Sequence, residues 1–251
     1  LIVETVAYWA VPVFFMLTGA TLMDYRKRYS TKEFFIKRFT KTGIPFVAWS
    51  MFFLVLNIHA GYVQIESLSF KEVVDMMLNC EILSIYWFFP ALYSVYFAIP
   101  VIAAIPEKSR KRIYNYIIVY GLCVISILPV VFTVSGMKFN GDLSPAICGG
   151  YLLYVIIGYQ LTKTNLTRRI RLLIYVCGAG GGLLRFLTTL LISQEIGEIY
   201  RGFWGYTAFP TVALAVAVFV WFQYHDWNWL AKRKGLYNGS AKYLVRVLGY
   251  I

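Results

Sequence analysis

Apolar residues are grouped into seven long stretches along this 251-residue chain, separated by shorter polar segments. Six stretches lack Asp, Glu, Lys and Arg over most of their length, and Arg185 alone interrupts the seventh. A helix needs about 20 apolar residues to cross a bilayer, where it satisfies its own backbone groups. The pattern therefore predicts an all-α, polytopic transmembrane bundle. The predicted spans are residues 5–23, 43–63, 82–105, 113–134, 146–162, 172–193 and 203–224.

The composition indicates that lipid surrounds most of the chain. Apolar residues make up 59% of it and charged residues 14%. In an average soluble domain, apolar residues make up about 45–50% and charged residues about 25%. A soluble core of this length cannot hide so much apolar surface from water. These proportions exclude a soluble enzyme, a disordered tail and a secreted disulfide scaffold.

The positive charges lie mainly on one side of the predicted membrane. The net charge is +12, and 20 of the 24 Lys and Arg residues fall on one side, in alternate segments between the spans and in the segment after the seventh span. In a soluble protein this charge would suggest a nucleic-acid partner, whereas in a membrane protein it marks cytoplasmic loops. We therefore predict a multi-pass protein of the cell membrane, with cytoplasmic basic loops and no nucleic-acid partner.

Both ends of the sequence lie in apolar segments. Leu1 falls on the outer side in this topology, where a preceding span would deliver it. Residues 243–251 have the composition of the start of an eighth span. No repeat or long linker divides the chain. We expect residues 1–251 to form a single integral membrane domain, truncated at both ends.

Cysteine and histidine show no pattern typical of metal binding. The four cysteines lack CxxC spacing and histidine partners, so we predict no metal site. They fit packing residues best, and a Cys80–Cys148 bridge on the outer face is the less favoured alternative. His59 and His225 fall near ends of predicted spans, where a general base and an ordinary interfacial residue both fit.

A basic cluster, Lys37, Arg38 and Lys41, precedes the second span, which opens near Pro45. Arg38 and Lys41 are three residues apart and share a helix face. They could bind a phosphate-rich ligand at the membrane surface. Alternatively, they could contact anionic lipid as an ordinary cytoplasmic cluster.

Arg185 is the charge that lies inside a span. An ionisable residue at that depth is costly and usually faces a cavity or a partner. Gly178, Gly182 and Arg185 follow one another at i, i+4 and i+7, and such a small-residue face favours close helix packing. The arginine is thus predicted to point into the bundle and to hold a substrate anion or a carboxylate such as Glu4. A structural ion pair and a snorkelling side chain are the alternatives.

The segment Y-W-F-F-P-A-L-Y-S-V-Y-F-A-I-P is rich in aromatic residues. Its Trp87 falls near the predicted outer interface, where aromatic residues commonly anchor a span. Stacking on a sugar ring is the functional alternative for this side chain.

Several segments are informative in combination. Five segments follow one another along the chain: V-P-V-F-F-M-L-T-G-A, F-I-K-R-F-T-K-T-G-I-P-F-V-A-W-S, the aromatic segment above, Y-L-L-Y-V-I-I-G-Y and K-Y-L-V-R-V-L-G-Y-I. In this order they resemble the acyltransferase-3 family of integral membrane O-acyltransferases. The first three are similar to the family's Pro-x-Phe-Phe-x-x-Ser-Gly pattern, to its basic Arg-x-x-Arg loop followed by a Pro and a Trp-Ser, and to its Trp-Phe…Leu…Tyr…Pro segment.

The resemblance implies a bundle of about ten helices that transfers an acyl group to a glycan. The donor is usually cytoplasmic acetyl-CoA, and the acceptor is a hydroxyl of an extracytoplasmic or lipid-linked glycan. Arg38 and Lys41, with Lys37 beside them, would face the CoA phosphates. Lys41 stands where the family usually has a second arginine, so it keeps the charge but lacks bidentate geometry.

The family's catalytic histidine belongs to a first helix that is not in this chain, so no catalytic residue is assigned. Trp87, Arg185 and Glu4 would lie on the acceptor side. Two other functions share the polytopic topology and the buried arginine: a transporter of polysaccharide or lipid-linked sugar, and a ligand-binding membrane domain of a larger protein.

Overall fold

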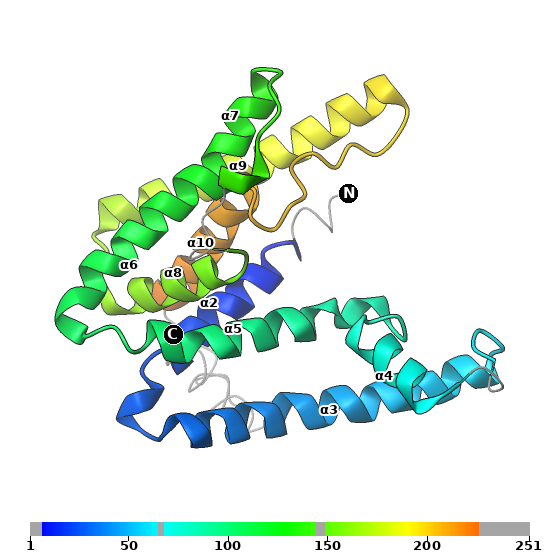
Figure 1. The fold of residues 1–251 in the computed structure, drawn as a ribbon. Coiled ribbons are helices and arrows are strands. Elements are labelled where there is room, and N and C mark those ends of the chain that lie inside the picture. The colour runs from blue at the N-terminus through cyan, green and yellow to red at the C-terminus, as the bar shows by residue number, and fades with distance from the viewer. Residues whose placement is uncertain (1–6, 65–67, 144–148, 226–251) are drawn as a thin grey trace, which may run out of the picture. The chain divides into compact units, whose positions relative to one another are not determined.

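The computed structural model describes residues 7–64, 68–143 and 149–225, and these residues form helices and connecting segments with no β-strand. The chain divides into two compact units (Figure 1). The first comprises Leu1–Leu22 and Pro106–Ile251, and the second comprises Met23–Ile105. The expectation of a single domain over residues 1–251 stays a prediction.

The all-helical class is confirmed for the described residues, but the predicted number of spans is not. Four helical stretches are long and apolar enough to cross a membrane, namely Thr31–His59, Ser84–Ile102, Glu107–Thr133 and Arg168–Ile196. The apolar helix α10, Phe209–Tyr224, is shorter, as are α2, Ala10–Leu22, and α8, Leu152–Lys163. The predicted start of an eighth span at residues 243–251 lies outside the described residues.

The second unit is built on two long helices. Its elements are η1 (Tyr25–Lys27), α3 (Thr31–His59), α4 (Phe70–Leu78), η3 (Ser84–Trp87) and α5 (Phe88–Ile102). Helix α3 begins twelve residues before the predicted span, because the Ser30 side chain caps it by accepting a hydrogen bond from the Glu33 backbone amide at 3.3 Å. Lys37, Arg38 and Lys41, which precede the predicted span, therefore lie on this helix.

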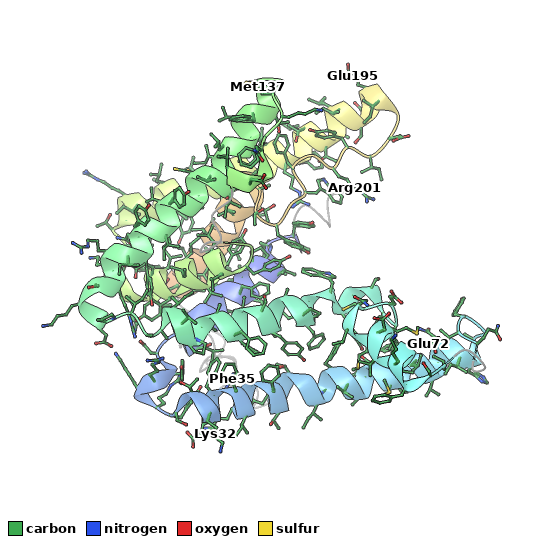
Figure 2. All side chains as sticks on the ribbon, viewed as in Figure 1. Lys32, Phe35, Glu72, Met137, Glu195 and Arg201 are labelled. Carbon is green, nitrogen blue, oxygen red and sulfur yellow. The ribbon has the colours of Figure 1, made fainter. Side chains whose placement is uncertain are left out.

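Aromatic rings form most of the contact between α3 and α5. The ring centroids of Phe46 and Phe89 are 4.8 Å apart, and those of Phe39 and Tyr93 are 5.3 Å apart. Figure 2 shows Phe35 between the two helices, where its ring lies 5.6 Å from that of Phe97. Such pairs contribute about 0.5–1.5 kcal/mol beyond their buried area. The aromatic segment found in the sequence thus packs α5 against α3.

The first unit contains the remaining helices. Besides α2, α8 and α10, these are α6 (Glu107–Gly121), a π-helical segment (Leu122–Ile127), α7 (Leu128–Val134), a 3₁₀ turn (Gly141–Leu143) and α9 (Arg168–Ile196). Helix α6, the π segment and α7 follow one another without a break. A π segment within an α-helix is uncommon and often lies at a functional site.

Two glycines bring α2 and α8 into direct backbone contact. A Cβ added to Gly19 would overlap the carbonyl of Val155, and a Cβ added to Gly158 would overlap the carbonyl of Met16. Each glycine therefore faces the backbone of the opposite helix. This close approach maximises van der Waals contact in lipid, where the hydrophobic effect does not drive helices together.

Helices α9 and α10 approach one another through a second glycine pair. A Cβ added to Gly178 would overlap the Ala217 side chain, and one added to Gly181 would lie 3.0 Å from the Pro210 carbonyl oxygen. Gly182 has a looser neighbour at 3.9 Å, the Leu214 side chain. The small-residue face predicted from the sequence therefore lies toward α10, and it includes Gly181, which approaches α10 more closely than Gly182 does.

We predict that Gly19→Ala or Gly158→Ala lowers the free energy of unfolding by about 3 kcal/mol or more, because overpacking against a rigid backbone cannot relax. Denaturant unfolding of the purified protein in detergent micelles measures the effect. Gly180→Ala is the matched control, since nothing lies within 4 Å of its added Cβ. Equal stability of the Gly19 and Gly180 variants would contradict the close crossing.

The short helix α4 begins with a reciprocal cap that should respond to pH. The Ser69 amide donates to the Glu72 carboxylate at 2.6 Å, and this bond, with that from the Ser69 side chain, lowers the pKa of Glu72. Because the pKa of Glu72 is lower in the folded state, its charge stabilises α4 at pH values above the pKa of the unfolded chain, which is about 4.3. This stabilisation disappears as the pH falls through the pKa of the folded state.

Amide protection of α4, corrected for the intrinsic exchange rate, should therefore decrease as the pH falls below about 4.3. Glu72→Gln should abolish this pH dependence, because an amide does not titrate in the range. Hydrogen exchange read by mass spectrometry tests both expectations. An unchanged profile in the variant would show that the cap does not stabilise the helix through its charge.

Candidate functional site

The basic cluster of Lys37, Arg38 and Lys41 lies on the first part of α3. Lys37 and Lys41 are exposed, and the Lys37 ammonium lies 4.2 Å from the centre of the Tyr29 ring. Arg38 is half-buried and lies close enough to Tyr96 of α5 to affect its electrostatic environment. The three side chains thus present positive charge both at the surface and at the edge of the α3–α5 contact.

The Arg38 guanidinium combines burial with an unmet hydrogen-bonding group. Its Nε atom is shielded from solvent and has no hydrogen-bond partner among the described residues. A buried polar group without a partner is rare and requires an explanation. An anion at this point would accept the unused N–H, and a phosphate group suits arginine because both can form two parallel hydrogen bonds.

A hollow of about 550 Å³ extends along α3 beside this cluster. Its described lining includes Phe39, Gly43 and Val47, which follow one another at intervals of four residues. The lining is apolar apart from Thr40. The hollow therefore offers an apolar surface next to a group of positive charges, a combination that suits an amphiphilic anion.

Arg185 lies in the interior of the first unit, as its sequence context predicts, with 1% of its surface exposed. Its guanidinium carbon is 3.7 Å from the centre of the Tyr8 ring and 5.1 Å from that of Trp204. Its Nη1 atom donates to the Thr211 hydroxyl at 3.5 Å. Cation–π contacts of this kind contribute about 2 kcal/mol when desolvated. Glu4, the predicted carboxylate partner, lies outside the described residues.

The segment between α9 and α10 is held over Arg185 by side chains from several helices. The Trp204 indole donates to the Thr189 hydroxyl at 3.0 Å, and the Tyr154 hydroxyl donates to the Tyr206 carbonyl at 2.5 Å. The Tyr8 and Tyr206 rings stack with centroids 4.5 Å apart. Sequence analysis missed this aromatic surround, because its members come from segments far apart in the chain and share no spacing.

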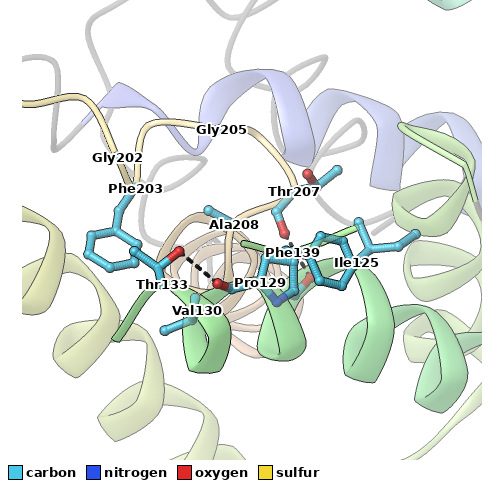
Figure 3. A pocket seen from close by; sticks show the side chains of 11 residues that line it. Ile125, Pro129, Val130, Thr133, Phe139, Gly202, Phe203, Gly205, Thr207 and Ala208 are labelled. Carbon is cyan, nitrogen blue, oxygen red and sulfur yellow. Dashed lines mark hydrogen bonds between the residues drawn. The ribbon is translucent and has the colours of Figure 1, made fainter. Parts of the chain in front are cut away.

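A cavity of about 270 Å³ lies beside the π segment (Figure 3). Ser126 of that segment is fully buried and donates to the Thr207 carbonyl at 2.7 Å. Phe139 and Phe203 line the cavity with apolar faces, and none of its described lining residues carries a charge. The cavity therefore suits a small uncharged group.

The remaining candidates lie at helix ends. Trp87 is half-buried at the end of η3, with its ring 6.3 Å from that of Phe88. His59 is exposed at the end of α3, and His225 is exposed after α10 with its ring 4.9 Å from that of Trp221. Cys80 is a free thiol, and Cys148 lies outside the described residues. Among the residues that the structure describes, no group of three or more His, Cys, Asp or Glu side chains could hold a metal ion.

A family model for an acyltransferase domain, that of the acyltransferase-3 family, matches residues 1–250. No curated protein and no solved structure matches the chain.

Thr189→Val should loosen the segment of residues 197–208, because it leaves the Trp204 N–H without its acceptor. An unpaired buried donor costs about 1–3 kcal/mol, so the free energy of unfolding should fall by that amount. Hydrogen exchange of the segment should rise at the same time. The neighbouring Thr188→Val is the control, since the Thr188 hydroxyl bonds only within α9 in the described contacts. Equal exchange in the two variants would refute the anchoring role of Thr189.

Proposed function

The chain belongs to the acyltransferase-3 family, and we propose that it is a membrane O-acyltransferase that moves an acetyl group from cytoplasmic acetyl-CoA to a glycan. The acceptor is a hydroxyl of an extracytoplasmic or lipid-linked glycan. In the reaction the acyl carbon–sulfur bond breaks and an ester carbon–oxygen bond forms. The proton of the acceptor hydroxyl leaves with the thiol of CoA. No described residue is assigned as the base that moves it.

The observation that carries the proposal is the buried and unpartnered Nε of Arg38. CoA presents a diphosphate and a 3′-phosphate, which supply several anionic acceptors. Arg38 would bind one phosphate group by paired hydrogen bonds, while the exposed Lys37 and Lys41 add charge around it. Lysine is a point charge on a flexible stem, so it attracts phosphate without fixing its orientation.

The distribution of charge supports a cytoplasmic donor site. The basic segments that flank the spans would face the cytoplasm by the positive-inside rule, in a multi-pass protein of the cell membrane. The first turns of α3, with the basic cluster, would then lie on the side that contains acetyl-CoA. This orientation places the donor and an extracytoplasmic acceptor on opposite sides of the membrane.

The acceptor would be recognised by groups distinct from the basic cluster. Trp87 provides an aromatic face on which a sugar ring can stack. Arg185 would hold the Tyr8 and Trp204 rings in place in the first unit. Glu4 is its proposed carboxylate partner. An anionic group on the acceptor would be the alternative partner of Arg185.

Arg38→Gln should weaken acetyl-CoA binding by about 2–3 kcal/mol, because hydrogen bonds between charged groups are strong. Lys41→Gln should have a smaller effect of about 1 kcal/mol, since it removes one exposed charge. The measurement is CoA release from acetyl-CoA by the full-length protein in nanodiscs supplied with candidate glycans. Lys32→Gln, an exposed lysine on the same helix, is the matched control.

Acetyl-CoA turnover that does not change in Arg38→Gln would refute the proposed donor site. Movement of intact sugar across liposomes without consumption of acetyl-CoA would replace the enzyme by a transporter. Both outcomes can be read from one set of proteoliposomes, because radiolabelled acetyl and sugar are counted separately.

A further inference from the structure

Helix α4 has polar residues on one side and apolar residues on the other. Successive residues of an α-helix are about 100° apart, so Lys71, Glu72 and Asp75 fall within a single arc of about 100°. The other residues of the helix are all apolar and occupy the rest of its circumference: Phe70, Val73, Val74, Met76, Met77 and Leu78. Helix α4 is therefore amphipathic along its whole length.

The apolar side of α4 is only partly covered by the described chain. None of the helix's residues is buried, and 86% of the Phe70 surface and 62% of the Leu78 surface are exposed. Val73 and Met77, on the same side, are half-buried. An exposed apolar side with a polar border is typical of an interaction site. The remaining cover must therefore come from outside the described part of the chain.

The polar side of α4 is suited to water. Asn79 donates to the Asp75 carboxylate at 3.0 Å, and the exposed Ser69 and Glu72 form the reciprocal cap of the first turn. Lys71 is also exposed, so this side combines one positive charge with two negative ones. Such a side has no net attraction to anionic headgroups, and any binding to a membrane would depend on the apolar side.

The segment after α4 connects the helix to the last turn of α3. There the Asn57 side-chain amide donates to the carbonyl of the buried Ile82 at 3.0 Å. Ile82 follows Asn79, the C-terminal cap of α4, by three residues, so the end of α4 lies within about 11 Å of it. The stretch Ser84–Ile102, which is long and apolar enough to cross a membrane, begins two residues later. The end of α4 is thus close to the ends of two candidate spans.

We propose that α4 is an interfacial helix whose apolar side binds the lipid surface of the outer leaflet. Both stretches that flank it have the composition of membrane spans, so lipid surrounds the site where α4 begins and ends. An interfacial helix lies in the plane of the membrane, with its apolar side about 5–10 Å deep at the boundary of headgroups and acyl chains. The segment that contains α4 is on the outer side by the positive-inside rule.

The lipid contact does not depend on the proposed acyl transfer, because it involves only α4 and its neighbours. It would nevertheless affect the proposed acceptor side. Helix α4 leads through a short segment into η3, which ends at Trp87. Anchoring of α4 in the headgroup region would therefore hold Trp87 at the outer interface.

The test places a nitroxide spin label at single positions of α4 in the full-length protein, in nanodiscs of phosphatidylcholine. The label is attached through p-acetylphenylalanine, so the native cysteines stay in place. It replaces Phe70 or Met77 on the apolar side and Lys71 or Asp75 on the polar side. Molecular oxygen concentrates in lipid and a nickel chelate in water, so the ratio of their collision rates reports the surroundings of the label.

We expect the ratio of oxygen to nickel collisions to be several-fold higher at Phe70 and Met77 than at Lys71 and Asp75. Addition of phosphatidylglycerol should not change it, because the contact is apolar. Val55, an exposed apolar residue of α3, is the reference for lipid, and the exposed Lys32 is the reference for water. The exposed Phe70 decides the outcome if a label at Met77 prevents folding.

Equal, water-like ratios at all labelled positions would overturn the inference, because the apolar side would then face water. Low collision rates with both reagents at Phe70 would also overturn it, since protein and not lipid would cover the apolar side. Spectral broadening by a second label would identify that cover as a second copy of the chain. A difference between the two sides that requires phosphatidylglycerol would contradict the apolar origin of the contact.

Discussion

The close crossing of α2 and α8 is the constraint on which the first unit depends. In a bilayer, helices gain little by removing apolar surface from lipid, so contact between them relies on close packing. Gly19 and Gly158 allow each backbone to approach the other directly. The same crossing brings Phe15 of α2 onto Tyr151 beside α8, with stacked rings 4.5 Å apart. A larger residue at either glycine would separate the helices and disrupt this stacking.

The position of α2 in turn determines the environment of Arg185. Tyr8, just before α2, stacks on Tyr206 and covers the guanidinium, while the α9–α10 crossing at Gly178 and Gly181 places Arg185 in the interior. A charge at this depth needs compensation, and the aromatic faces and the Thr211 hydroxyl provide part of it. Packing and electrostatics are therefore coupled. The glycine contacts bring together the aromatic rings around Arg185, and these rings offset part of the cost of burying its charge.

The all-helical class could be predicted from the sequence, because the length of a segment and its lack of charged residues distinguish a membrane helix from other elements. The burial of Arg185 also followed from its glycine-rich context. The predicted second span begins at residue 43, after the start of α3, because the apolar residues alone defined it. The Ser30 cap begins the helix earlier, within the basic segment. Gly181 was not part of the predicted face, because spacing alone does not determine how closely each glycine of a helix approaches the neighbouring helix.

The candidate sites were predictable only in part. The density of positive charge identified Lys37, Arg38 and Lys41 in the sequence. The proposed phosphate binding depends on the burial of the Arg38 Nε atom, which sequence spacing does not reveal. Trp204 and Thr189 were missed because their contacts join residues distant in sequence.

The basic cluster on α3 is proposed to bind the phosphates of the acyl donor. Photo-crosslinking with a CoA that carries an aryl azide on its adenine base tests this most directly, with adducts mapped by mass spectrometry. We expect the label to attach to peptides that contain residues 31–48, and excess CoA to prevent the labelling. Labelling confined to other helices, or labelling that CoA does not prevent, would contradict it.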